Sequence, residues 1–531
     1  TPKPSSAASD VYKRQVIDAA FAQLPPEVID EDTERIKKNL KSRREKLDKY
    51  ALEYRKVLLH TVLLSGTDKK DKFVITRQPK GVTSVEIYSI SKKGDSLVFN
   101  HTYNRDQTKE LWIYGLDDDD VFEVKGKPER PIMLRLIGGQ NNDTYTVENG
   151  KRVKLYDFKS KENTFKTDSH TAMRLTDDYE TNSYDYKKPD YNYWVGYPMI
   201  GYNPDDGVKA GAVASYTVNN FNRRPFSRKH TFGANYFFAT QGFEFTYKGV
   251  FMNVASKWNI GLDARYTSPN FSINYFGLGN ETKNYDDDLG MDYNRVKLQI
   301  FRVSPSVFKQ GANGSFMELK ADFETIEVDG SHSRYVNEPG VLRPALFEHI
   351  QYGGVQGMYK FENYDNASMP AMGMQFYAKG GWKTSFDALE RNFAHAESGL
   401  TFYHRITRND RLVFVSGVRG KFIFNNSYEF YQASTLGGDS DLRGYRRERF
   451  AGRNTFLHTN DLRFTIAKAK SFIPLTYGVS GGYDYGRVWL PGEHSDKWHQ
   501  GAGGGFWVNG ADVLTALSLI HISEPTRRTP I

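Results

Sequence analysis

The chain has 531 residues, a formal net charge of +8, a pI of about 9.0 and a mean hydropathy of −0.63. It has no run of about 18 apolar residues, which excludes a helical membrane span. It has no cysteine, which excludes disulfides, zinc ribbons and thiol nucleophiles. The 72 basic and 64 acidic residues give a dilute excess with no cluster in the body of the chain, whereas a nucleic-acid partner would need clustered charge. A membrane β-barrel is still a possible fold, because its strands alternate apolar and polar residues and their mean hydropathy is therefore polar. The 14% aromatic content suits the aromatic girdles of such a barrel at the two membrane interfaces.

The two ends of the chain do not continue the patterns beside them. The first 15 residues lack the apolar segment of a secretory signal, and the stretch from about Ser518 interrupts a strand pattern with a basic tail. Both ends resemble translated sequencing-adaptor sequence, with natural disordered tails as the alternative. We therefore expect 1–15 and 520–531 to be artefactual or disordered, and the natural protein to continue past both.

Residues 16–66 are predicted to be a helical segment, with helix from about Pro25 to Leu63. Asp30 or Asp32 can cap its N-terminus. Lys and Arg fill one face, and apolar residues recur at helical spacing on the other, at Leu40, Leu47, Tyr50, Tyr54 and Leu58. The pattern favours a solvated amphipathic helix packed on the next domain. Binding to nucleic acid or to a membrane surface is the alternative.

Residues 67–166 are predicted to be a small β-rich periplasmic domain. Short alternating runs such as 84–88 indicate strands. Residues 115–124 match residues 138–147, each a glycine and acidic or amide turn that leads into a strand. Their offset is about one rung of a β-solenoid or sandwich.

The second of these turns resembles a calcium-binding β-roll repeat, because clustered carboxylates and carbonyls are what Ca²⁺ requires. The candidate ligands are Asp117, Asp119, Asn141 and Asp143. Two degenerate copies are few for such a site, so structural turns are the favoured interpretation. We expect no other cofactor.

A polar linker over 167–190 leads into strands that alternate persistently over 191–519. In residues 317–324, for example, Met317, Leu319 and Phe323 oppose Glu318 and Lys320. The runs are about 10–13 residues long, as in outer-membrane barrels. The tight turn at 203–207 and the long loop at 328–348 predict short turns on one rim and long loops on the other. We count roughly fourteen or fifteen strands, so the predicted fold is mainly β: a sixteen-stranded-type transmembrane antiparallel barrel without its last strand. A short helix and a small soluble domain precede it.

Three segments form the sharpest local signal. They read LGGDSDLRGY at 436–445, GYDYGRVW at 482–489 and GAGGGFW at 501–507. Their order and spacing resemble the C-terminal barrel of the bacterial surface-antigen superfamily, which contains the BamA/TamA assembly factors and the two-partner-secretion transporters. The resemblance covers about Tyr191 to Leu517.

The resemblance implies that Arg443, Gly444 and Tyr445 form the tip of an extracellular loop that folds back into the barrel lumen. Arg443 would pair with Asp484 of the wall motif that ends at Gly486, since its planar fork can bond a carboxylate bidentately. Asp461 is a second wall candidate, although Arg463 follows on the same strand face. The third segment contributes the strand glycines Gly503, Gly504 and Gly505. The alternative is that Arg443 is a solvated loop residue without a specific role.

By the same resemblance, the protein would assist outer-membrane protein insertion or translocate a polypeptide through a weak seam between first and last strands. Its partners would be outer-membrane lipid, substrate polypeptides and periplasmic proteins, with no nucleic acid. Residues 16–166 do not look like the POTRA modules of the assembly factors. The alternative is therefore an anchor or exporter barrel of a larger fusion, with a metallophosphoesterase or patatin-like domain upstream. A porin-like channel is disfavoured, because porins lack the Arg-Gly-Tyr loop.

No catalytic site is predicted within the chain. Residues 478–482 match G-x-S-x-G, but they fall in a predicted strand, whereas a nucleophile elbow needs a strand-to-helix turn. There is no H-E-x-x-H motif, phosphate loop or zinc spacing. An enzymatic domain upstream stays open.

Overall fold

The computed structural model describes residues 14–188, 190–203, 205–221, 223–255, 257–330, 333–387, 391–438, 441–469, 474–510 and 514–523. The chain divides into two compact units, residues 1–190 and residues 191–531. No helix in these described ranges is long and apolar enough to cross a membrane.

The first unit begins with helices. They are α2 (Arg14–Phe21), the 3-10 turn η1 (Pro26–Val28), α3 (Glu31–Glu45) and α4 (Leu47–His60). Asp30 caps α3, its Oδ1 accepting the backbone N–H of Thr33 at 2.8 Å. The prediction of one helix to Leu63 is wrong in two respects: Lys46 separates α3 from α4, and Thr61 begins a strand. Residues 61–65 leave the helix because they pair with a strand of the β-rich region.

The rest of the first unit is strands, a further 3-10 turn and a short helix. They are β1 (Thr61–Ser65), β2 (Asp71–Arg77), η2 (Pro79–Gly81), β3 (Val82–Ser89), β4 (Ser96–Asn104), β5 (Glu110–Leu116), β6 (Val121–Lys125), β7 (Met133–Gly139), β8 (Thr144–Val147), β9 (Val153–Asp157), β10 (Thr164–Lys166), β11 (Ala172–Leu175) and α5 (Tyr179–Asn182). One sheet has the order β1-β5-β7-β9-β11 and is parallel throughout. The other has the order β10-β8-β6-β2-β3-β4, parallel from β10 to β2. Successive coils thus place one strand in each sheet, which is the solenoid arrangement.

Two ladders run through the solenoid interior. Aromatic rings stack from coil to coil, with centroid separations of 4.6, 5.0 and 5.2 Å along Phe73, Phe122, Tyr145 and Phe165. Beside them, Asp120 accepts the backbone N–H of Asp71 at 2.7 Å, and Asp143 accepts that of Asp120 at 2.8 Å. The repeated turns therefore provide buried acceptors for backbone groups that would otherwise be unpaired.

The repeat of glycine and then aspartate five residues later has a steric reason. A Cβ at Gly115 would collide with the Asp120 carboxylate, and one at Gly138 with that of Asp143. Burial raises the pKa of Asp120 to about 8. Burial and the nearby charge of Asp157 also raise the pKa of Asp143.

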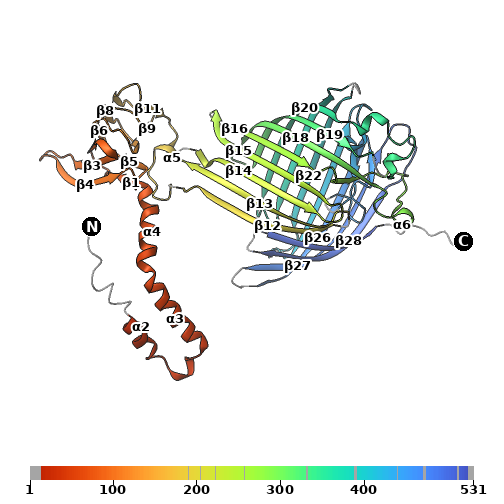
Figure 1. The fold of residues 1–531 in the computed structure, drawn as a ribbon, viewed down its shortest axis with the longest axis horizontal. Helices are drawn as coiled ribbons and strands as arrows, with labels where there is room; N and C mark the ends of the chain where they lie inside the picture. Colours follow the sequence, from red (N-terminus) through yellow and green to blue (C-terminus); the bar gives the residue numbers. More distant parts are fainter. Residues whose placement is uncertain are drawn as a thin grey trace. The chain divides into compact units, whose positions relative to one another are not determined.

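The second unit is a large antiparallel barrel (Figure 1). Its strands are β12 (Tyr193–Asn203), β13 (Gly207–Asn220), β14 (Arg223–Phe237), β15 (Gly242–Ala255), β16 (Trp258–Thr267), β17 (Ser272–Asn274), β18 (Arg295–Gln310), β19 (Ser315–Val328), β20 (Ile350–Tyr364), β21 (Gly373–Ser385), β22 (Asn392–Arg405), β23 (Leu412–Ile423), β24 (Ser434–Leu436), β25 (Phe450–Gly452), β26 (Asn454–Ala469), β27 (Leu475–Trp489), β28 (His499–Gly510) and β29 (Leu514–Ser523). The loops contain α6 (Asp286–Leu289), η3 (Tyr335–Asn337), η4 (Pro344–Phe347) and η5 (Phe430–Gln432).

Each barrel strand pairs with its neighbour along the chain, from β12 at one end of the order to β29 at the other. β17 adds to β18, and β24 and β25 form a separate ribbon. The mainly β barrel fold predicted from alternation is therefore correct. The boundary expected at residue 519 falls inside β29, because Leu519 to Ser523 pair with Gly505 to Gly501 of β28.

The barrel wall is apolar outside and charged inside. On β19, Leu319 is 59% exposed on the outer face, while Lys320 and Glu324 bond to charged partners across neighbouring strands. An exposed apolar outer band of this kind suits contact with lipid.

The long loops share one rim. Because the strands alternate in direction, loops 268–294, 329–349 and 424–453 all lie at the same end of the barrel. The other end has shorter connections, such as 311–314 and 406–411. The tight turn at 203–207 was expected on the rim opposite the long loops. That placement is wrong, since β12 runs toward the long-loop rim.

Candidate functional site: the lumen loop and the barrel wall

The site is built on the loop between β24 and β25, two short strands that pair antiparallel. Three of its glycines have positive φ: Gly437 at 121°, Gly438 at 108° and Gly444 at 89°. Such angles are strained for other residues, which explains the glycines of the motif. Leu442 is fully buried in an apolar cluster with residues of β24, β25, β26 and β27. This cluster fixes the loop against the wall.

Arg443 bonds to both wall carboxylates. Its Nη1 lies 2.6 Å from Asp461 Oδ1 on β26, its Nε lies 2.5 Å from Asp484 Oδ2 on β27, and its Nη2 bonds to Asp484 Oδ1. The bond to Asp484 is bidentate, the strongest geometry available to a guanidinium and a carboxylate. Arg463, which shares a strand face with Asp461, instead donates to the Pro370 carbonyl. Asp461 is therefore available to form its ion pair with Arg443.

Neighbouring glycines make room for this pair. A Cβ at Gly482 would meet Asp461 Oδ1 and, at 2.7 Å, Arg443 Nη2, and one at Gly501 would collide with the Arg443 carbonyl. Gly486 faces the Leu436 side chain of β24. Gly503, Gly504 and Gly505 pair with Gly482, Gly481 and Ser480 of β27. The close approach to the loop thus depends on Gly482 and Gly501, which lie four residues before the predicted Gly486 and two residues before the predicted Gly503.

Tyr445 completes the tip. Its hydroxyl donates to the Gln500 carbonyl of β28 at 3.1 Å, and its ring lies 5.3 Å from that of Phe450. Arg443 and Tyr445 of the tip therefore contact β26, β27 and β28.

The arginines after the tip form a second set of contacts that sequence reasoning missed. Arg446 Nε lies 2.7 Å from Asp205 Oδ1, and Arg447 Nη2 lies 3.0 Å from Asp206 Oδ2. Both aspartates belong to the turn between β12 and β13. Arg446 also bonds to Asp286 in the loop after β17. The run of arginines and the Asp-Asp pair were visible in the sequence, but nothing local relates residues 241 positions apart.

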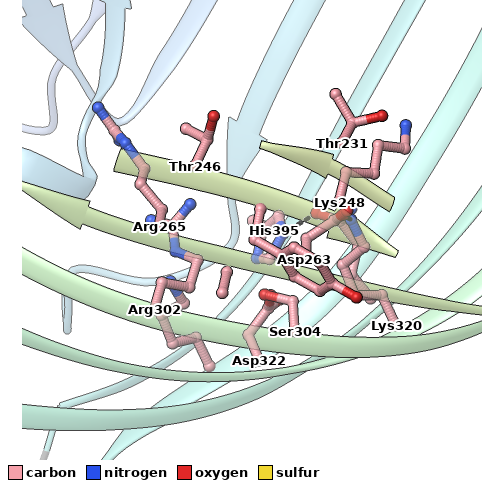
Figure 2. A pocket seen from close by; sticks show the side chains of 14 residues that line it. Thr231, Thr246, Lys248, Asp263, Arg265, Arg302, Ser304, Lys320, Asp322 and His395 are labelled. Carbon is pink, nitrogen blue, oxygen red and sulfur yellow. Dashed lines mark hydrogen bonds and ion pairs between the residues drawn. The ribbon is translucent and has the colours of Figure 1, made fainter. Parts of the chain in front are cut away.

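The lumen wall nearby carries a lattice of ion pairs around a cavity of about 560 Å³ (Figure 2). Lys320 bonds to Asp263 at 2.8 Å, and Arg302 and Lys383 both bond to Glu324, at 2.6 and 2.5 Å. The three cations outnumber the two carboxylates, but each is ion-paired. The lumen lining is therefore polar and cross-linked by ion pairs.

The four calcium candidates are dispersed over two turns. Asn141 donates to Asp117 at 3.0 Å, Asp119 accepts the backbone N–H of Asn142 at 3.1 Å, and Asp143 is buried in the aspartate ladder. Within the described residues, no group of three or more His, Cys, Asp or Glu is placed to hold a metal ion. These contacts suit structural turns, and calcium binding stays a prediction without support from the geometry.

The G-x-S-x-G match lies inside a barrel strand. Residues 478–482 are in β27, where Ser480 pairs with Gly505 on one side and Arg463 on the other. A nucleophile elbow requires a strand-to-helix turn, so this serine is not built as one.

Fold and site together define a large antiparallel β-barrel with a charged lumen and a loop anchored in it by an arginine. The structure is similar to BamA from Haemophilus ducreyi lacking POTRA domains 1–3, at 12% identity and a TM-score of 0.44, covering 63% of this chain and 71% of that one. It is also similar to CdiB from Escherichia coli, at 13% identity and a TM-score of 0.40, covering 63% of this chain and 62% of that one. For CdiB from Acinetobacter baumannii the identity is 10% and the TM-score 0.36, with 62% and 60% covered. No family model and no curated protein matches the chain.

Proposed function

We propose that the chain is an outer-membrane barrel of the BamA/TamA-like type, which assists the insertion of outer-membrane proteins or the translocation of polypeptides. In this proposal the N-terminal unit is periplasmic, and the lumen loop controls a seam between the first and last strands. No nucleotide is needed, since the folding free energy of the substrate drives the process.

The observation that supports the proposal is that the β24–β25 loop makes contacts near both the first and the last strands of the sheet order. Arg443 and Tyr445 bond to β27 and β28, near the last strand of the order. Arg446 and Arg447 bond to the turn of the first hairpin, β12–β13. Because the loop is bonded near both ends of the sheet, it restrains the separation of the first and last strands. Release of the loop would allow these strands to separate.

The second candidate is an anchor or exporter barrel for a larger fusion. The N-terminal unit favours it, because stacked parallel coils with an aspartate ladder differ from small α/β modules. This candidate predicts a stable barrel that has no effect on the insertion of other barrels.

The test uses the full chain in liposomes and measures how fast an unfolded outer-membrane protein inserts. We expect faster insertion than into empty liposomes, and loss of this acceleration in Arg443→Ala. The substitution leaves Asp484, only 1% exposed, without its main partner. Breaking a buried pair in this way costs about 3–5 kcal/mol, which heat-modifiable gel migration should report.

Two variants sharpen the result. Arg408→Ala removes an exposed arginine from the opposite rim and should change nothing. The double variant Arg446→Ala, Arg447→Ala removes both ion pairs between the loop and the first hairpin but keeps Arg443, so it should change the insertion rate while the barrel stays folded. Unchanged migration and unchanged insertion in Arg443→Ala would contradict the proposal. An insertion rate equal to that of empty liposomes for the unaltered chain would favour the second candidate.

A further inference from the structure

We propose that helices α3 and α4 bind an anionic phospholipid surface, with their apolar stripe inserted between the headgroups. The apolar stripe consists of Ile36, Leu40, Leu47, Tyr50, Tyr54 and Leu58. The proposal requires only that the barrel of the same chain stands in a membrane. It holds whether or not the barrel assembles other proteins.

The apolar stripe is exposed on both helices. Within α3 and within α4 its residues recur every three or four positions, which places them on one face of each helix at 3.6 residues per turn. Their side chains are between 39% and 64% exposed, and neither α3 nor α4 has a buried residue. A core-facing helix would bury this face, so the pattern leaves six large side chains for an external partner.

The rest of the helical surface is strongly basic. Between Arg35 and Lys56 there are ten Lys or Arg and three Asp or Glu, a net charge of +7. An amphipathic helix with a cationic polar face is the type that lies in a membrane interface and is attracted by anionic lipids. Arg43 falls within the stripe, where its long stem can lie along the apolar face while the guanidinium reaches the headgroups.

Helix α2 packs beside α3 and leaves the apolar stripe uncovered. Asp18 of α2 bonds to Lys41 at 2.5 Å and to Lys37 at 3.1 Å, and both lysines lie beside the stripe rather than on it. Figure 1 shows α2 next to α3, with α4 continuing between α3 and the strands of the first unit. Within the described part of this unit, no strand covers the stripe.

Charge favours lipid over a second copy of the helix as the partner. Two copies packed by their stripes would bring a charge of +7 against an equal charge of the same sign, and like charges oppose such pairing. Anionic headgroups have the complementary charge. The covalent link to a membrane-embedded barrel also keeps the helix near a bilayer, which raises its effective concentration there.

The absence of native cysteine allows single-cysteine probes on the full chain. Tyr54→Cys places a probe on the apolar stripe, and Lys56→Cys places a control probe on the opposite face. Each variant is labelled with an environment-sensitive fluorophore and reconstituted into vesicles of phosphatidylethanolamine and phosphatidylglycerol, or of phosphatidylcholine alone. We expect the probe at position 54 to shift to the blue and resist iodide quenching only with phosphatidylglycerol, while the probe at 56 stays quenchable.

A second substitution tests the stripe itself. Leu47→Glu in the position-54 probe background should lower the affinity for phosphatidylglycerol vesicles by roughly tenfold or more. The variant would bury a charged side chain where the unaltered chain buries leucine. Ser42→Glu, which adds the same charge off the stripe, should weaken it far less. Gel migration and insertion rate of the barrel should be unaffected by any of these variants, so failure here is distinguishable from failure of the assembly proposal.

Three outcomes would overturn the inference. One is equal quenching of the position-54 probe in both lipid compositions. Another is a blue shift that grows with protein density rather than with phosphatidylglycerol content, which would indicate a second copy. The third is a shift abolished by nuclease, which would indicate bound nucleic acid.

Discussion

The two units of this protein both have strands that alternate apolar and polar residues, but the apolar face is buried in the first unit and exposed in the second. In the solenoid, Phe122 is fully buried and stacks between the rings of two other coils. In the barrel, Phe245 is 52% exposed and faces outward. Both belong to strands in which every second residue is aromatic or aliphatic. The difference shows that alternation specifies a two-faced strand, while the surroundings decide which face is inside.

Charged groups differ between the units in the same way. Asp120 and Asp143 are buried without cationic partners, and burial, first of all, raises the pKa of both. In the barrel, Glu324 is equally buried but bonds to Arg302 and Lys383. Burial without a cation thus favours the neutral form of Asp120 and Asp143, whereas Glu324 in the lumen is ion-paired.

The largest effect expected from this comparison is in the aromatic ladder. Phe122→Ala removes the central ring of the stack and should destabilise the first unit by about 3–5 kcal/mol. Hydrogen exchange of β2, β6 and β8 would measure it. The matched change Phe245→Ala on the outer barrel face should leave exchange in the first unit unaltered. Equal protection in the unaltered chain and Phe122→Ala would mean that the ladder adds little to stability.

A smaller effect is expected on the outer face of the barrel. Leu319, which pairs with Gly357 near the middle of β20, should tolerate charge poorly: Leu319→Arg should cost about 2–4 kcal/mol in vesicles. Its control, Thr246→Arg, adds the same charge in the lumen cavity. Urea midpoints of the reconstituted barrel would compare them. If Leu319→Arg and Thr246→Arg lower the free energy of unfolding equally, the outer face does not contact lipid.

The smallest effect concerns pH. The pKa of Asp120 is raised from 3.8 to about 8 on folding, so its neutral form favours the folded state. This contribution is fully present below pH 3.8 and is lost as pH rises through about 8. Asp120→Asn keeps the acceptor for the Asp71 N–H and removes the titration, so the first unit should become more stable at pH 8 and less pH-dependent.

The reverse substitution is available in the same ladder. Asn163 accepts the backbone N–H of Asp143 at 2.7 Å, so Asn163→Asp should steepen the pH dependence. Hydrogen exchange between pH 5 and pH 8, corrected for intrinsic rates, would measure both slopes. A slope in Asp120→Asn equal to that of the unaltered chain would show that Asp120 is ionised in the folded protein.

Several features could be predicted because their cause is local. The cap at Asp30 needs only a helix start and a short polar side chain, and the barrel strands need only a period of two. The repeat at Gly115 and Gly138 identified the coils for the same reason. The helix end near Leu63 was wrong, since pairing of β1 with β5 overrode the helical pattern. The tight turn at 203–207 was assigned to the wrong rim, because the length of a turn does not fix the direction of its strands.

What the sequence determined by itself was a mainly β chain with a large barrel and a conspicuous Arg-Gly-Tyr motif. These follow from periodicity and from residues close together in the chain. Only the tertiary structure decided that Arg446 and Arg447 reach Asp205 and Asp206, that Gly482 and Gly501 make room for Arg443, and that the apolar stripe on α3 and α4 stays exposed. Each of these depends on which distant segments fold against one another, and strand pairing and packing fix that choice rather than any local preference.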